Sequence, residues 1–224
     1  MELKSIFNSE VLGIIGVTLR MSFASTLIAS VFGIILGLLL ESKSFPLKRI
    51  VVRLCRTLMA TPPVVAGLVV YLLLMRRGPF GSLGLLFTVR AMVIAQVFII
   101  TPIIAGMVYT YASRSAPAIR AFAKTMGAGH FQTQLLLLKE MRGEFYFAVI
   151  TAFSRAISEV GAVMIVGGNI QHKTRTMTTA ISMLRNMGNF GQGITLGIIL
   201  LLIAFILQSL SDLLHKEDAP EENF

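Results

Sequence analysis

Apolar and polar positions divide the chain into long apolar stretches separated by charged connectors. Four stretches contain no Asp, Glu, Lys or Arg: residues 21–40, 57–75, 91–113 and 186–211. Each is long enough to cross a bilayer, because about 20 helical residues match the hydrocarbon core. A fifth stretch, 145–168, contains only two charged residues. The pattern therefore predicts an all-α polytopic membrane protein with five transmembrane helices.

These spans leave little of the chain for any other domain. We expect one transmembrane domain over residues 1–211, followed by an acidic cytoplasmic tail over 212–224. The opening residues, MELKSIFNSE, have no basic segment ahead of a short apolar core, so the first span is expected to be its own insertion signal. The expected spans cover about 14–40, 57–75, 91–113, 145–168 and 193–211, with a coupling loop over 114–142.

Two connectors, 41–56 and 114–142, each hold five of the 20 Lys and Arg residues, whereas the loops on the opposite side hold three each: Arg76, Arg77 and Arg90 in one, and Lys173, Arg175 and Arg185 in the other. By the positive-inside rule both connectors face the cytoplasm. Because they are the first and third connectors, we expect the N-terminus outside and the C-terminus in the cytoplasm. This placement also accounts for the net charge of +9 without a nucleic acid partner, since no basic run is interleaved with aromatic residues.

Composition and motifs exclude most enzyme classes. Only 14% of the residues are charged, against about 25% in soluble domains, which excludes a soluble enzyme. The sequence contains no GxxxxGK[ST] phosphate loop and no CxxC or HExxH motif. Its three histidines lie in connectors or in the tail. We therefore expect no catalytic residue, no metal site and no cofactor bound by this chain.

Helix-breaking residues fall inside two predicted spans, at Thr61-Pro62-Pro63 and at Pro102. Proline removes a backbone donor and bends a helix. Bent helices suit a translocation path, although for Pro102 a kink without function explains the pattern equally well. Close helix contacts are predicted at two pairs of glycines four residues apart, Gly33 with Gly37 and Gly193 with Gly197.

Arg155 and Glu159 form the one pair of ionisable residues inside a predicted span. Four residues apart on a helix, they lie on one face and are close enough to pair. A lone charge at mid-bilayer costs about 2.5 to 3.5 kcal/mol on insertion scales, and pairing removes most of that penalty. Two interpretations stay open: a neutralised pair that holds one helix against its neighbours, or a pair that shapes a pathway.

The third connector is patterned as two short helices. Ser115 and Pro117 form a start signal, and Gly127 is placed to end the first helix. A second helix is expected from about His130 to Leu138. Docking into a groove of a partner protein and lying on lipid both explain a short amphipathic helix. Apolar residues recur in the first helix at helical spacing, at Ile119, Phe122 and Met126.

The same connector resembles a known motif. AFAKTMG (121–127), followed by AGHFQTQLLLLKE (128–140), resembles the cytoplasmic EAA-type loop of permease subunits of binding-protein-dependent ABC importers. Ala123 and Gly127 match that loop. Ala121 and Phe122 stand where Glu and Ala are usual, and Lys139-Glu140 replaces a later Leu-Pro.

A second resemblance is more specific. SRAISEVGAVMIVGGNI (154–170) and TRTMTTAI (174–181) resemble the permeases that import molybdate, sulfate and tungstate. TPPVVAGLVVYLLL (61–74), GPFGSLGLLFT (78–88) and Glu140 are most similar to the tungstate type. The resemblance implies a type I ABC importer permease with the MetI-like fold, which moves a tetrahedral oxyanion across a prokaryotic plasma (inner) membrane.

The resemblance also implies partners and sites. The permease is expected to form a homodimer in the lipid bilayer, with two ATPase subunits that bind the ATP and an extracytoplasmic solute-binding protein. An odd number of spans cannot form two equal inverted halves, so a two-fold pathway requires a second copy. The ATPase-coupling residues are then expected to be Phe122, Ala123, Met126, Gly127 and Gly129.

The pathway is expected to use neutral donors, because a transported dianion must bind weakly enough to be released. Helix-helix hydrogen bonds and loop caps explain the same hydroxyl and amide residues equally well. A molybdate or sulfate permease, an ion-coupled secondary carrier and a membrane scaffold are the alternative functions. The expected pathway residues are Arg155, Ser158, Glu159, Asn169, Thr178 and Thr179.

Overall fold

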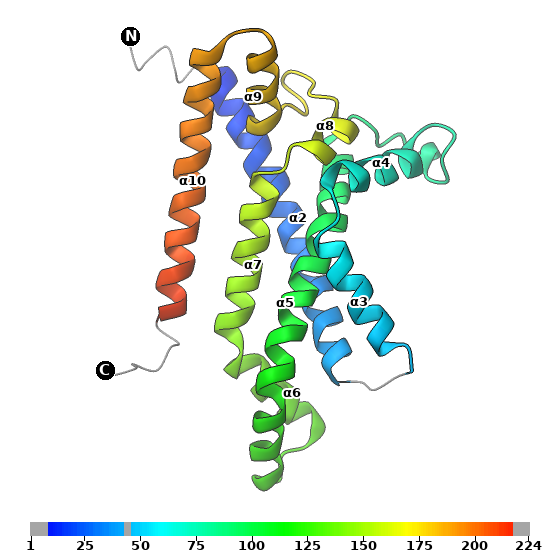
Figure 1. Ribbon diagram of the computed structural model, residues 1–224, viewed down its shortest axis with the longest axis vertical. Coiled ribbons are helices and arrows are strands. Elements are labelled where there is room, and N and C mark those ends of the chain that lie inside the picture. Colours follow the sequence, from blue (N-terminus) through cyan, green and yellow to red (C-terminus); the bar gives the residue numbers. More distant parts are fainter. Residues whose placement is uncertain (1–8, 43–45, 217–224) are drawn as a thin grey trace.

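The protein is described by a computed structural model that covers residues 9–42 and 46–216, and all regular elements in these ranges are helices (Figure 1). The all-α fold predicted from the sequence is therefore confirmed. The helices are α2 (Ser9–Ser42), α3 (Lys48–Met59), α4 (Pro63–Leu74), η1 (Gly81–Leu83), α5 (Val89–Thr125), α6 (His130–Glu140), α7 (Arg142–Ile157), α8 (Gly161–Gly167), α9 (Met177–Asn186) and α10 (Phe190–Lys216).

Three helices in the described ranges, α2, α5 and α10, are each long and apolar enough to cross a membrane. Two further pairs pass the same test only together: α3 with α4, bent by 104°, and α7 with α8, bent by 59°. The chain thus has up to five spans if each bent pair counts as one. Figure 1 shows α2, α5, α7 and α10 along the long axis, with α6 at one end and α9 at the other.

The segment expected as a second span with a proline bend, 57–75, is not one helix. α3 ends at Met59 and α4 begins at Pro63 after the 104° bend. Pro62 has an extended ψ of 127°, so the chain leaves the helical conformation before the second proline. Proline disfavours a helical conformation in the residue before it, which explains why Pro62-Pro63 produces a break rather than a mild kink.

The segment expected as a fourth span, 145–168, is also broken. α7 ends at Ile157 and α8 begins at Gly161. The Ser158 hydroxyl donates to the carbonyls of Ser154 and Arg155 at 3.0 and 3.1 Å. A side chain that bonds the preceding turn in this way competes with helix continuation.

The prediction of a separate helix beginning at Ser115 and Pro117 is wrong, because α5 continues from Val89 to Thr125 through both Pro102 and Pro117. Ala112 and Ala116 are fully buried. Ala123, which follows Pro117 in the same helix, is also buried, so packing before and after the proline holds the helix together despite the missing donor. The third predicted span and the first coupling helix form one continuous rod.

The predicted end of that helix at Gly127 and the start of the next helix at His130 are confirmed. Gly127 has a φ of +69°, its N–H donates to Lys124, and the N–H of Ala128 donates to Ala123. This pair of bonds is a Schellman motif, which favours glycine at the left-handed position.

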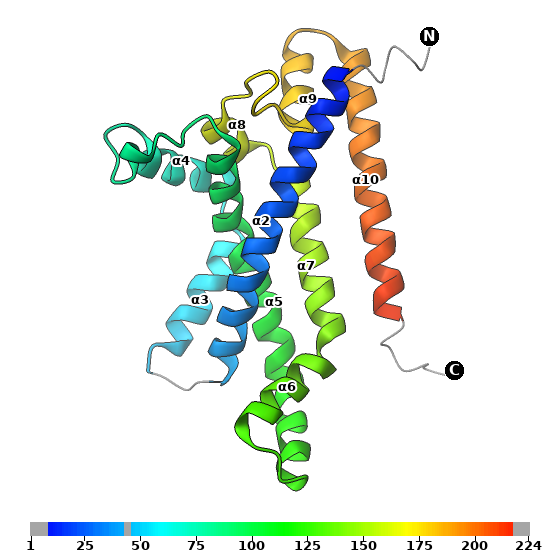
Figure 2. The same ribbon diagram turned by 180° about the vertical axis from the view of Figure 1, so that it is seen from behind.

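The core lies where α2 packs along α5, as Figure 2 shows from behind. A Cβ atom on Gly33 or Gly37 would lie 2.7 Å from Ile104 or Val108, so the close contact predicted for this glycine pair is confirmed. The second predicted pair makes no such contact. A Cβ on Gly193 would reach only Leu184 at 3.8 Å, and one on Gly197 would meet no described atom within 4 Å.

α10 lies at the edge of the bundle, where it contacts α7 and α9. Ile14, Met177, Ala180 and Leu196 form a small apolar cluster at the α9 end. The expected tail over 212–224 overlaps α10, which runs to Lys216, and residues 217–224 lie outside the described residues.

Candidate translocation pathway and coupling surface

The break between α7 and α8 brings three of the predicted pathway residues together. A guanidinium nitrogen of Arg155 lies 3.0 Å from a carboxylate oxygen of Glu159, so the predicted ion pair forms. The other carboxylate oxygen of Glu159 accepts from the backbone N–H of Ala162 at 3.2 Å. The pair therefore bridges the break, with Ser158 between its two members.

The two charges differ in their access to solvent. Glu159 is 3% exposed, whereas the Arg155 side chain is 37% exposed. A buried carboxylate needs compensation, which the guanidinium and the Ala162 N–H supply. The arrangement anchors the negative charge inside the protein and leaves the positive charge facing an accessible space.

The predicted threonines lie at the start of α9 and are engaged within the chain. Thr178 is buried, and its hydroxyl donates to the backbone carbonyl of Glu159 at 2.8 Å. Thr179 is buried in a capping box with Thr176, whose N–H donates to the Thr179 hydroxyl at 2.9 Å. Thr178 thus ties α9 to the α7–α8 break, while Thr179 closes the end of its own helix.

Asn169 lies at the other end of α8 from Glu159. It follows the left-handed Gly168 and is itself left-handed, with a φ of +51°. Its side-chain oxygen is buried and has no hydrogen-bond partner among the described residues. The structure therefore separates Asn169 from the group formed by Arg155, Ser158, Glu159 and Thr178.

Gln96 is hydrogen-bonded to the last turn of α7, next to the α7–α8 break. It is not among the pathway residues expected from the sequence. It is fully buried in α5, where its amide donates to the Ala156 carbonyl at 2.7 Å. Its side-chain oxygen accepts from the Ser25 hydroxyl at 2.6 Å. These two bonds join α2, α5 and α7 at Ala156, the residue that follows Arg155 of the ion pair. A lone amide in the charge-free stretch 91–113 is the signal that marks it.

The predicted coupling residues lie where α5 turns into α6. Phe122 and Met126 are 60% and 71% exposed, and Gly127 and Gly129 are also at the surface. Ala123 is buried, so its side chain supports the turn from inside rather than facing outward. An open pocket of about 330 Å³ is lined by Ala118, Ile119, Phe122, Leu136 and Glu140.

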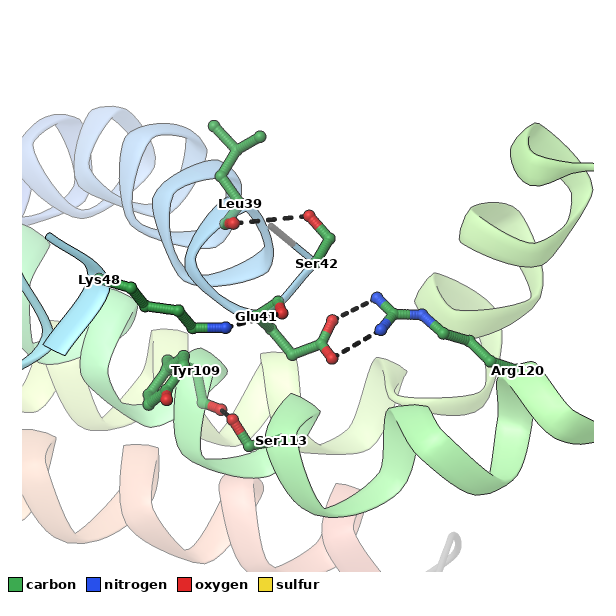
Figure 3. A network of polar contacts seen from close by, with 7 residues as sticks. All are labelled: Leu39, Glu41, Ser42, Lys48, Tyr109, Ser113 and Arg120. Atoms are coloured by element: carbon green, nitrogen blue, oxygen red, sulfur yellow. Dashed lines mark hydrogen bonds and ion pairs between the residues drawn. The ribbon is translucent and has the colours of Figure 1, made fainter. Parts of the chain in front are cut away.

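This end of α5 is braced against α2 and α3 (Figure 3). The Arg120 guanidinium donates to both carboxylate oxygens of Glu41, one of them at 2.8 Å. Lys48 donates to the Glu41 backbone carbonyl at 3.1 Å and lies 5.9 Å from the centre of the Tyr109 ring. A forked arginine-carboxylate pair fixes orientation as well as distance. These contacts connect the candidate coupling surface to α2 and α3.

The chain is similar to known permeases along most of its length. The chain is 42% identical over 217 residues to the tungstate uptake system permease protein TupB of Peptoclostridium acidaminophilum, across 97% of this chain and 95% of that protein. It is 36% identical over 172 residues to TupB of Campylobacter jejuni subsp. jejuni, across 77% of this chain and 72% of that protein.

A chain of the MetNI methionine ABC transporter, solved in an inward-facing conformation, superposes with a TM-score of 0.79. The match covers 98% of this chain and all of that chain at 17% identity, so it shows a shared fold. The predicted MetI-like permease fold is thereby confirmed. A family model described as the inner membrane component of binding-protein-dependent transport systems matches residues 29–217. The chain therefore belongs to the family of inner membrane components of binding-protein-dependent transport systems.

Proposed function

We propose that this chain is the membrane-spanning permease of an ATP-driven importer that moves a tetrahedral oxyanion, tungstate, into the cytoplasm. The observation that carries the proposal is the similarity to TupB, which extends over 97% of the chain. The chain itself performs no chemistry in this scheme. Its expected ATP-binding partners are two ATPase subunits, and its solute is delivered by a binding protein outside the membrane.

The α7–α8 break supplies a physical basis for anion passage. Helices that cross a membrane keep their backbone groups bonded, so a break is tolerated only where protein or water satisfies them. Here the half-exposed Arg155 attracts an anion, while the buried Glu159 limits the net charge of the site. A balanced site binds an anion weakly enough to release it, as a path requires.

The coupling surface is proposed to dock into the ATPase. Its exposed anchors, Phe122 and Met126, are apolar and stand beside the open pocket at Ile119. An apolar helix face of this kind fits a groove in a partner protein. In the proposed topology this end is cytoplasmic, with the N-terminus outside, the C-terminus inside and the permease in the plasma membrane.

A second copy is proposed to complete the pathway. α4 exposes an apolar face at Val64, Val65 and Leu68, each at least 49% exposed. On its other side α4 packs against α8, because a Cβ on Gly67 would lie 2.6 Å from the Ala162 Cα. A homodimer that covers this face of α4 would bring the two α7–α8 breaks toward a shared axis.

Reconstitution tests the proposed function. The permease, the ATPase subunit and the binding protein of the same organism are placed in proteoliposomes, and tungstate accumulation is measured by elemental mass spectrometry. Uptake is expected to require ATP and both partners, and to be insensitive to proton uncouplers at constant ATP. Uptake without the ATPase, driven by an ion gradient, would favour a secondary carrier. Stronger uptake of molybdate or sulfate would change the assigned oxyanion.

A further inference from the structure

A pocket of about 290 Å³ opens beside the first turns of α2, next to the loop that joins α8 to α9. It lies at the opposite end of α2 from the coupling brace at Glu41 and is separate from the group around Glu159. Its polar lining consists of Glu10, Arg20, Gln171, His172 and Arg175.

The pocket has more donors than acceptors. A Glu10 carboxylate oxygen accepts from Gln171 at 2.8 Å and from Arg175 at 3.2 Å. The Arg175 side chain is only 13% exposed, and its Nε has no hydrogen-bond partner among the described residues. Arg20 is exposed and forms no ion pair within the described ranges. One carboxylate thus stands against two guanidinium groups.

The position of the lining residues along α2 indicates how deep the pocket lies in the membrane. Arg20 directly precedes the charge-free stretch 21–40, whose length matches the hydrocarbon core. Basic residues at such a boundary lie at the level of the lipid headgroups. This boundary starts the hydrocarbon part of the first span at residue 21 rather than at about 14, and it places the α2 residues that line the pocket, from Glu10 to Arg20, at and just beyond the headgroup layer.

The pocket is also open space rather than a packing gap. Gly13 and Gly16 line it, and a Cβ atom on either would meet no described atom within 4 Å. The loop on its other side is rigidly turned: His172 has a φ of +60°, and the N–H groups of Lys173, Thr174 and Arg175 all donate to the Ile170 carbonyl. The side chains that line the pocket are therefore carried on a fixed frame.

We propose that this pocket binds a tetrahedral oxyanion group, held by the guanidinium groups of Arg20 and Arg175 with Gln171 as a further donor. The planar guanidinium fork matches the oxygens of such anions. Glu10 acts as an internal competitor, because it occupies Arg175 and Gln171 until an anion replaces it. Free oxyanions and the phosphate of a phospholipid share this chemistry. The inference rests on the proposed function only for the side of the membrane, the extracytoplasmic one.

Binding is measured on the full-length permease in nanodiscs, without ATPase or nucleotide. Equilibrium dialysis against tungstate and against inorganic phosphate is performed in phosphatidylcholine nanodiscs. Retention of phosphatidylglycerol by native mass spectrometry is measured in nanodiscs that contain both lipids. Arg20→Gln removes one charge-assisted contact and is expected to weaken binding about tenfold. Glu10→Gln removes the competitor and is expected to strengthen it.

Gly16→Leu supplies a variant that leaves the protein's packing intact. Leucine favours the helix over glycine and fills the pocket, so binding should be lost while thermal unfolding is unchanged or raised. Gly197→Leu, also in open space and outside the pocket, is the matched control and should bind like the wild type.

The outcomes separate the two sources of the anion. If Arg20→Gln and Gly16→Leu weaken the binding of tungstate or phosphate and Glu10→Gln strengthens it, the ligand is a free oxyanion. If they alter only phosphatidylglycerol retention, the ligand is a lipid phosphate. Equal binding of tungstate, phosphate and phosphatidylglycerol by the wild type, Arg20→Gln and Gly16→Leu, or no binding of any of the three by the wild type, would overturn the inference. ATP-driven uptake is measured in parallel, and its absence in the wild type would count against the proposed function and leave the binding result standing.

Discussion

At the scale of single residues, the ion pair of Arg155 and Glu159 is the central feature of the proposed pathway. Its members are 3.0 Å apart, yet one is buried and the other half-exposed. The helix does not continue between them, so the pair also sets the geometry of the break. A change in either charge therefore acts on both the electrostatics and the shape of the site.

Glu159→Gln leaves Arg155 without its counter-charge but keeps an acceptor for the Ala162 N–H. We expect normal membrane insertion, a loss of stability of about 1 to 2 kcal/mol and slower uptake, because the anion is held too tightly at the unbalanced guanidinium. The measurement is uptake normalised to membrane expression. Normal uptake at normal expression would leave the pair with a structural role alone.

The double variant Arg155→Gln with Glu159→Gln separates the two contributions. If the pair couples directly, the double variant should lose less stability than the sum of the single variants, by about 0.5 kcal/mol or more. Thermal unfolding of all four proteins in one detergent gives this difference. Strict additivity would mean that the two side chains act independently.

Gln96 carries a second prediction at this scale. Gln96→Leu removes the donor to the Ala156 carbonyl and the acceptor for Ser25. We expect a loss of about 1 to 3 kcal/mol, because buried polar groups lose their partners. Gln192→Leu, at an exposed position, is the control for the change in residue type. Equal unfolding temperatures of the two variants would contradict the tethering role of Gln96.

At the scale of elements, the sequence predicts helix ends better than helix breaks. Gly127 and His130 mark their boundaries through local hydrogen bonds, which residue type determines. Pro62-Pro63 signals a break but not its angle of 104°. The continuity of α5 through Pro117 depends on the burial of Ala116 and Ala123 on either side of it, and α9 packs through Met177 and Ala180 against Ile14 and Leu196. Tertiary packing decides these features, so local patterns miss them.

The contact between α4 and α8 gives a prediction for elements. Gly67→Val places a side chain where a Cβ alone would lie 2.6 Å from the Ala162 backbone. We expect α4 to move away from α8, with a loss of about 1 to 3 kcal/mol from overpacking and with reduced uptake. Gly197→Val, which meets no described neighbour within 4 Å, is the control. Unchanged unfolding and uptake in Gly67→Val would contradict the close contact.

At the scale of the whole molecule, α5 connects the candidate coupling surface at one end to the region of the α7–α8 break. α5 runs from the loop that follows η1 to the candidate coupling surface, and the brace between Glu41 and Arg120 ties that surface to α2. Gln96 lies on the same α5 helix and holds the α7–α8 break. We predict that displacement of the candidate coupling surface reaches the candidate pathway through this continuous helix. The charged residues at both ends could be identified from the sequence. The connection between the two ends could not, because it requires α5 to continue unbroken from Val89 to Thr125.

A variant at the coupling surface tests this transmission. Gly127→Leu forces a left-handed conformation on a residue with a Cβ, which costs about 1 to 2 kcal/mol, although no described atom lies within 4 Å of that Cβ. We expect the permease to assemble but to lose uptake while the ATPase continues to hydrolyse ATP. Gly188→Leu is the matched control, because Gly188 has a φ of +74° and an equally open environment at the far end of α9. It carries the same backbone strain away from the coupling surface, so uptake should stay coupled to hydrolysis. Equal coupling in both variants would mean that the ATPase does not dock at Gly127.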